Sequence, residues 1–214
     1  MFRAIPIIVS AILLSRPGMP LPEARHYARV LQEEASRHDF DPLTAVAIVH
    51  FETHWQPGLV SPDGEDYGLG QIRARWWGAC RDDADPVHDP SPGCRAVKAS
   101  LLVGEVNLRR MSVIITANRE LCKDKTGTAN LPQWLAGYEG LNFPGRDRWC
   151  APNSRTMRVV EYRQQLLALL GPKPRHAPGK VAQATKAGRR GESAHSPAPV
   201  SHADKMRTNV PVKK

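Results

Sequence analysis

The sequence of 214 residues lacks several features that define common protein classes. Its one long apolar run covers residues 4–14, fewer than the roughly 20 that a membrane-spanning helix needs. No two of its four cysteines lie close enough in sequence to form a typical zinc-binding pair. Alternation of apolar and polar residues is also missing, so we expect at most a short β-hairpin, around residues 59–72. A stable transmembrane span, a structural zinc site and a large sheet are therefore disfavoured.

The N-terminus has the layout of a secretory signal. Arg3 supplies a positive charge, residues 4–14 are apolar, and residues 15–18 are more polar. We therefore predict that residues 1–20 are a signal peptide and that the protein is exported, to the periplasm or the cell exterior. No small-x-small cleavage site follows, so the cleavage position and an uncleaved anchor stay open. A buried N-terminal helix is the other alternative, and Pro6 argues against it.

The four cysteines fit an oxidising compartment, where they can form two disulfides. Three connectivities are possible. We favour Cys80 with Cys94, across a loop rich in Asp and Pro, and Cys122 with Cys150. The alternatives are the other two pairings and four buried free thiols.

The C-terminal segment, residues 171–214, differs in composition from the rest. It contains ten Lys and Arg against two acidic residues, so it carries most of the formal net charge of +9. It is rich in Pro, Ala and Ser and nearly lacks large apolar residues, which predicts a disordered tail. The tail could hold the protein on an acidic envelope polymer, or it could be solvated without a partner. Because interleaved aromatic residues are missing, no nucleic-acid partner is expected.

Between these ends, residues 21–170 form one predicted domain in which apolar residues recur at helical spacing. The predicted helices cover residues 22–38, 43–53, 95–117, 132–138 and 154–170. Asp41 is a favourable N-cap and Pro42 a favourable first helical residue. The helix that follows is apolar nearly all round, which predicts that it is the central core helix of a mostly α fold.

Glu52 lies in the last turn of this predicted core helix. Apolar burial and the negative end of the helix dipole both disfavour the carboxylate and raise its pKa. A carboxyl group with a raised pKa can protonate a glycosidic oxygen near neutral pH. Taken alone, Glu52 could instead be paired with Arg73 or Arg75 at the helix end.

The segment after Glu52 forms turns and ends in Gly68-Leu69-Gly70-Gln71. Glycines permit backbone conformations and close approaches that a side chain would block, as expected where a polymer lies along a cleft. The Gln71 side chain offers a donor and an acceptor for sugar hydroxyl and acetamido groups. A structural turn with a surface glutamine is the alternative.

In order and spacing, these residues resemble the soluble lytic transglycosylase domain, a lysozyme-like α fold related to goose-type lysozymes. The family has a helix ending in Glu-Ser, which corresponds to Glu52-Thr53 here. Its Gly-Leu-Met-Gln turn, some sixteen residues later, corresponds to Gly68-Leu69-Gly70-Gln71. Its Ala-Tyr-Asn-x-Gly motif corresponds to residues 136–140, which keep the tyrosine as Tyr138 but have Gly before it and Glu139 after it.

The resemblance covers residues 21–170 and implies an enzyme that acts on the glycan strands of peptidoglycan. In this family the glutamate, here Glu52, first protonates the oxygen of the β-1,4 bond between MurNAc and GlcNAc. It then takes a proton from the C6 hydroxyl, which attacks C1 and leaves a 1,6-anhydro-MurNAc end. No water, metal or cofactor is consumed. The resemblance also implies that Ser61, Gln71 and Tyr138 line the substrate site.

Two alternatives keep the fold and change the function. A muramidase would hydrolyse the same bond and needs a second carboxylate, for which the candidates are Asp63, Glu65, Asp66 and Glu139. A non-catalytic protein would only bind peptidoglycan or assemble on it. Trp55, Trp76 and Trp77 could stack on sugar rings or pack in the core.

A zinc protease is the competing enzyme class. His50 and His54 have the spacing of two zinc ligands on one helix face. Glu52, however, falls at the wrong offset for the general base of that motif.

Overall fold

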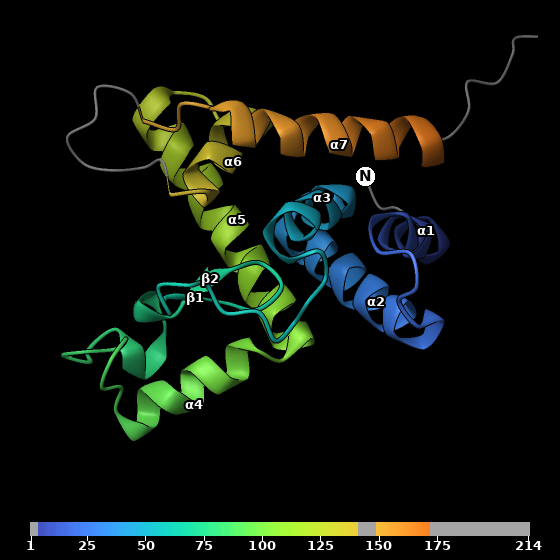
Figure 1. The fold of residues 1–214 in the computed structure, drawn as a ribbon. Helices are drawn as coiled ribbons and strands as arrows, with labels where there is room; N and C mark the ends of the chain where they lie inside the picture. The colour runs from blue at the N-terminus through green and yellow to red at the C-terminus, as the bar shows by residue number, and fades with distance from the viewer. Residues whose placement is uncertain (1–3, 141–148, 172–214) are drawn as a thin grey trace, which may run out of the picture. The chain divides into compact units, whose positions relative to one another are not determined.

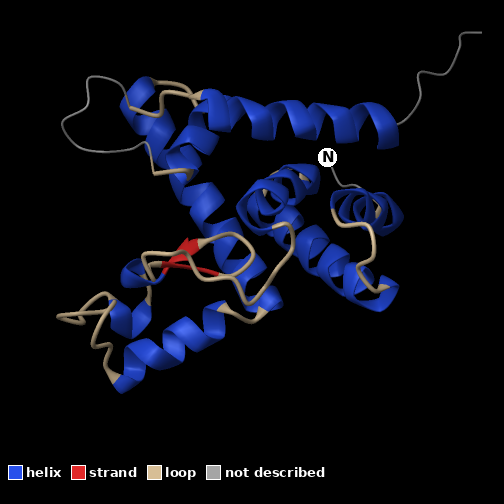
Figure 2. Cartoon of the chain, viewed as in Figure 1, coloured by secondary structure: helices blue, strands red, loops and turns tan. Residues whose placement is uncertain are grey.

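The computed structural model describes residues 4–140 and 149–171, which belong to one compact unit. Within these residues it contains seven α-helices and one two-stranded hairpin, which confirms the predicted mostly α fold (Figures 1 and 2). The predicted tail, apart from Gly171, lies outside the described residues. The elements are α1 (Ile5–Ser15), α2 (Leu21–His38), α3 (Pro42–Thr53), β1 (Asp66–Tyr67), β2 (Ile72–Arg73), the 3-10 turns η1 (Ala74–Trp76) and η2 (Gly78–Cys80), α4 (Pro92–Leu101), α5 (Gly104–Thr126), α6 (Leu131–Tyr138) and α7 (Ser154–Leu170).

Helix α3 is the central core helix, as predicted. Asp41 caps it by accepting a hydrogen bond of 3.0 Å from the backbone N–H of Leu43. The first eight residues of α3 are all buried, and the helix packs against α1, α2 and α7. Arg163 of α7 binds both Asp41 and Thr44 at the start of α3. Glu52, in the last turn of α3, therefore belongs to a helix that neighbouring helices hold on several sides.

The hairpin follows α3 and is held to α5 by one buried side chain. Strands β1 and β2 pair antiparallel, with Tyr67 opposite Ile72. Asn107 of α5 donates 2.7 Å hydrogen bonds to the carbonyl oxygens of Tyr67 and Leu101, and accepts one of 2.7 Å from the N–H of Gly70. Gly68 lies in the left-handed region, and a Cβ there would overlap Asn107 and the carbonyl of Leu101. The glycine is thus required by the close approach of the two segments.

The single helix predicted over residues 95–117 is wrong, because the chain forms α4 and α5 instead. Leu102 and Val103 separate the two helices, and Val103 has an extended backbone. The Leu101 carbonyl accepts its hydrogen bond from the Asn107 side chain. Gly104 begins α5 against the ring of Tyr27, where a Cβ would lie 2.8 Å from the ring carbons. Tertiary contacts, which apolar spacing does not record, therefore place the break.

Helix α1 packs in the core against α2, α3 and α7. Ile8 and Ile12 are fully buried, and the hydroxyl of Ser15 accepts a 2.8 Å hydrogen bond from the indole N–H of the fully buried Trp55. Pro6 lies in the first turn, where its missing N–H interrupts no helical hydrogen bond. The described chain thus has the buried N-terminal helix that the sequence left as an alternative. Removal of residues 1–20 on export stays a prediction.

None of the described helices combines the length and the apolar character that crossing a bilayer requires. The structure also contains the favoured cysteine pairing, Cys80 with Cys94 and Cys122 with Cys150. The first disulfide joins η2 to α4. The second joins α5 to the segment before α7.

Candidate active site

Two hydrogen bonds join the three sequence motifs of the candidate site. The hydroxyl of Thr53, at the end of α3, donates to the carbonyl oxygen of Leu69 at 3.0 Å. The hydroxyl of Tyr138, at the end of α6, donates to the carbonyl oxygen of Gly70 at 2.6 Å. The turn between β1 and β2 therefore lies between the ends of α3 and α6, and residues from all three motifs meet there.

Position 70 has no room for a side chain, so glycine fits there without a shift of its neighbours. A Cβ at this position would lie 2.7 Å from the hydroxyl oxygen of Tyr138 and 3.0 Å from the sulfur of Met111. The space that a larger side chain would fill is thus occupied by the tyrosine and by α5. A side chain at position 70 would therefore require Tyr138 or Met111 to shift.

Glu52, in the last turn of α3, is largely buried, with 11% of its side chain exposed. Burial raises the pKa of Glu52, and the charges of Glu139 and Asp66 raise it further. The guanidinium of Arg155 lowers the pKa, but burial outweighs it and the net direction is upward. Glu52 thus lies among groups from β1, the end of α6 and the start of α7.

The partner of Glu52 is Arg155, a residue that the sequence did not point to. The Nη2 atom of Arg155 lies 2.6 Å from Oε2 of Glu52. Arg73 and Arg75, the partners considered from the sequence, bind elsewhere. Arg73 binds both oxygens of Asp66, at 3.0 and 3.1 Å, and Arg75 pairs with Glu65.

Glu139 is a second buried carboxylate beside the same arginine. Its side chain is 5% exposed, and its Oε1 lies 4.0 Å from Nε of Arg155. The hydroxyl of Thr156 donates to its Oε2 at 2.7 Å. Thr156 also belongs to the capping box of α7, formed with Asn153. The guanidinium of Arg155 is therefore shared, at unequal distances, by two carboxylates.

Ser61 and Gln71 lie in the hairpin region, where both bind their own loop. The Ser61 hydroxyl donates to Asp63 and accepts a 2.9 Å hydrogen bond from the N–H of Asp66. Gln71 has a positive φ of 46°, and its side-chain amide donates to the carbonyl oxygen of Gly68 at 3.1 Å. A ligand that bound these side chains would therefore have to replace their partners within the loop.

Tyr138 is held in its neutral form. Burial and the charge of Glu52 raise its pKa well above the usual value. The phenol therefore keeps the proton that it donates to Gly70.

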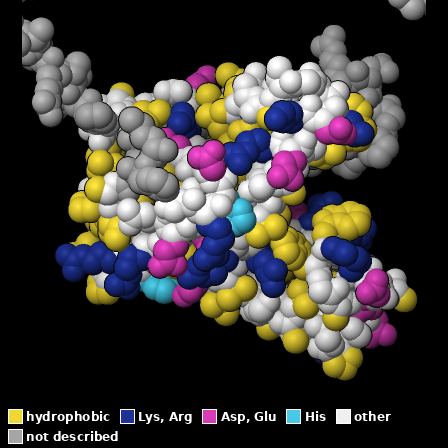
Figure 3. All heavy atoms as spheres, turned by 180° about the vertical axis from the view of Figure 1, so that it is seen from behind, with side chains coloured by type: hydrophobic (Ala, Val, Ile, Leu, Met, Phe, Trp, Pro, Cys, Tyr) yellow, Lys and Arg dark blue, Asp and Glu magenta, His cyan; other side chains and the backbone are white. Residues whose placement is uncertain are grey.

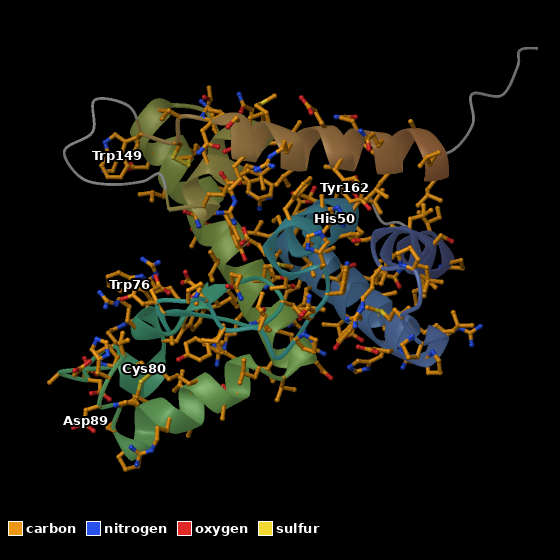
Figure 4. All side chains as sticks on the ribbon, in the orientation of Figure 1. His50, Trp76, Cys80, Asp89, Trp149 and Tyr162 are labelled. Atoms are coloured by element: carbon orange, nitrogen blue, oxygen red, sulfur yellow. A yellow bond between two sulfur atoms is a disulfide. The ribbon has the colours of Figure 1, made fainter. Side chains whose placement is uncertain are left out.

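The tryptophans considered from the sequence have three different environments. Trp55 is fully buried in the core, and the guanidinium of Arg110 lies 4.8 Å from the ring centre of Trp77. Trp76 is 62% exposed and lies at the edge of the part that carries the hairpin (Figure 4). Trp76 is thus the most exposed of the three.

Of the two histidines beside Glu52, His50 packs against α1 and α7, whereas His54 is exposed. His50 stacks on Tyr162 with ring centres 4.2 Å apart, and its Nδ1 lies 3.0 Å from the Ser15 hydroxyl (Figure 4). Burial and the nearby His54 lower the pKa of His50. Across residues 4–140 and 149–171, no three His, Cys, Asp or Glu side chains are grouped as a metal site requires.

The surface is notched between the part that carries α6 and the start of α7 and the part that carries the hairpin and α4 (Figure 3). Two of the residues that act on the pKa of Glu52 belong to elements of these two parts, Asp66 to β1 and Arg155 to α7.

Comparisons of the chain with protein-family models, with curated proteins and with solved structures find no match.

Proposed function

We propose that the protein is a peptidoglycan lytic transglycosylase whose general acid and then general base is Glu52. The observation that carries this proposal is the setting of Glu52, a carboxyl group 11% exposed at the end of the core helix with its pKa raised by burial. A raised pKa is what a carboxylic acid needs to donate a proton near neutral pH. The hydrogen bonds from Thr53 and Tyr138 to the hairpin turn support it, because they gather the three motifs around that carboxyl.

The reaction needs only one carboxyl group. Protonated Glu52 gives its proton to the oxygen between MurNAc and GlcNAc, and the bond from C1 of MurNAc to that oxygen breaks. The resulting carboxylate takes the proton of the C6 hydroxyl of the same MurNAc as that oxygen attacks C1. The 1,6-anhydro end forms, and Glu52 is protonated again without the use of water or a cofactor.

The proposed substrate site extends from Glu52 along the hairpin. Ser61 and Gln71 would bind sugar hydroxyl and acetamido groups by exchanging their loop partners, and Tyr138 would hold the turn beside the reacting bond. The two disulfides are in keeping with action outside the cytoplasm, in the periplasm or beyond the cell. The basic segment after Gly171 would retain the enzyme on acidic envelope polymers.

Hydrolysis of the same bond is the second candidate, and Glu139 is the observation that favours it. A muramidase uses a second carboxylate to activate water or to act as nucleophile. Glu139 is 5% exposed and shares Arg155 with Glu52, so a second buried carboxylate does lie near the proposed acid. The other candidates, Asp63, Glu65 and Asp66, are bound to Ser61, Arg75 and Arg73.

Mass spectrometry of digested peptidoglycan tests the proposal, because it reports cleavage and reaction type together. We expect fragments ending in 1,6-anhydro-MurNAc from the wild type and none from Glu52→Gln. Glu161→Gln, the same change at an exposed position of α7, is the matched control and should digest like the wild type. Fragments with ordinary reducing ends would identify a muramidase. Binding to peptidoglycan without release of fragments would overturn both enzyme functions.

A further inference from the structure

Arg155 lies between two carboxyl groups. It contacts Glu52 at 2.6 Å and approaches Glu139 to 4.0 Å, while 48% of its own side chain is exposed. The two acids, at 11% and 5% exposure, are far more buried than the arginine. The guanidinium therefore lies near both carboxylates, while part of its side chain is in water.

The contact with Glu52 opposes the role proposed for that residue. An acid must hold a proton, whereas a guanidinium at hydrogen-bond distance favours the carboxylate. The reaction nevertheless requires both forms, the acid before the glycosidic bond breaks and the carboxylate between the two proton transfers. A second position for the guanidinium would resolve this conflict.

Glu139 supplies that second position. The Thr156 hydroxyl fixes one of its oxygens, and Thr156 is itself fixed by the capping box of α7. A buried carboxylate without a cationic partner is costly, so Glu139 attracts the guanidinium whenever Glu52 is neutral. Glu139 stands where the family's third motif has Asn, a residue that carries no charge.

The other groups that act on Glu52 have partners of their own. Asp66 of β1 is bound by Arg73, and the Tyr138 hydroxyl of α6 is bound to the Gly70 carbonyl. Arg158, one turn further along α7, lies over the ring of Phe51. Arg155 is thus the cation in contact with Glu52 among the described residues.

We propose that Arg155 and Glu139 are positioning residues for the acid and base steps of Glu52, a role that rests on the proposed function. Arg155 contacts Glu139 while Glu52 is protonated and returns to Glu52 when that proton has passed to the leaving oxygen. It leaves again when Glu52 takes the proton of the C6 hydroxyl. No proton or electron is gained or lost over the cycle.

The pKa of Glu52 in the free protein tests this inference without a substrate. In protein carrying ¹³C-labelled glutamate, NMR titration follows the Glu52 carboxyl carbon, assigned by its loss in Glu52→Gln. We expect Arg155→Gln to raise this pKa by about 1 or more, since a nearby opposite charge is removed. Glu139→Gln should lower it, because the competing negative charge is lost and Arg155 then binds Glu52 alone. Arg155→Lys keeps the charge, so the pKa of Glu52 in this variant should lie between the values in the wild type and in Arg155→Gln.

Arg158→Gln is the control, since it removes an arginine of the same helix that does not contact Glu52, and it should leave the pKa unchanged. Shifts of the same sign in Arg155→Gln and Glu139→Gln, or no shift in either, would overturn the inference whether or not the enzyme is active. Should the wild type cleave peptidoglycan, the alkaline limb of its pH profile should move up in Arg155→Gln and down in Glu139→Gln. Opposite pKa shifts in a protein that cleaves no glycan would overturn the catalytic role and the proposed function, while the charge pairing itself would stand.

Discussion

The hydroxyl of Tyr138 donates a 2.6 Å hydrogen bond to the carbonyl oxygen of Gly70, 68 residues earlier in the chain. The bond joins the end of α6 to the turn of the hairpin. Because Gly70 has no side chain, the phenol can lie directly against the backbone of the turn. The position of Tyr138 beside the proposed acid therefore depends on a glycine on another element.

Gly70→Ala should displace Tyr138 and weaken glycan cleavage. The added Cβ would meet the tyrosine hydroxyl at 2.7 Å and the Met111 sulfur at 3.0 Å, so one of them must shift. Such overpacking costs about 1–3 kcal/mol, which urea unfolding would measure beside the cleavage rate. Gly58→Ala is the matched control, because a Cβ at Gly58 meets no atom within 4 Å. Equal behaviour of the two variants would contradict the role assigned to Gly70.

Thr53 can be tested with two substitutions of opposite effect. Thr53→Val keeps the shape of the side chain but removes the hydroxyl that donates to the Leu69 carbonyl. We expect a loss of about 1–3 kcal/mol in unfolding free energy, because the buried carbonyl loses its donor, together with slower cleavage. Thr53→Ser keeps the hydroxyl and should cleave at nearly the wild-type rate. A Val variant as active as the Ser variant would show that this hydrogen bond does not hold the turn.

The sequence could predict those parts of the site that depend on local pattern. The cap at Asp41, the buried apolar helix that carries Glu52 and the glycines of the turn are all visible within 30 residues, and the structure shows each of them. Arg155 could not be found in this way, because it follows Glu52 by 103 residues and meets it only where α7 packs on α3. The break between α4 and α5 has the same origin, since Asn107 and Tyr27 act across the fold.

The raised pKa of Glu52 makes a prediction about stability. The folded state holds the proton of Glu52 more tightly than the unfolded chain does. The contribution of this proton to the free energy of unfolding is therefore complete at pH values below the pKa of Glu52 in the unfolded chain. It is lost as the pH rises through the folded pKa. Glu52→Gln stays neutral and should be more stable than the wild type at neutral pH, with the difference vanishing in acid. Urea midpoints measured from about pH 4 to pH 8 would show this.

Glu161→Gln provides the comparison for that experiment, because Glu161 is exposed and its substitution should change the midpoint little at any pH. The opposite result for Glu52→Gln, a lower midpoint at neutral pH, would mean that the ion pair with Arg155 outweighs burial. The same raised pKa predicts that glycan cleavage by the wild type declines on the alkaline side, as Glu52 loses its proton.

Helix α1 should contribute to stability as a part of the fold. Ile12 is fully buried, whereas Leu14 on the same helix is 49% exposed. We expect Ile12→Ala to lower the unfolding free energy by about 2–5 kcal/mol and Leu14→Ala to have a much smaller effect. A chain without residues 1–20 would expose the core face of α3 and leave the indole of Trp55 without its Ser15 acceptor, so it should unfold at a lower urea concentration. If the shortened chain is as stable as the full one, α1 is dispensable, as a removed signal peptide must be.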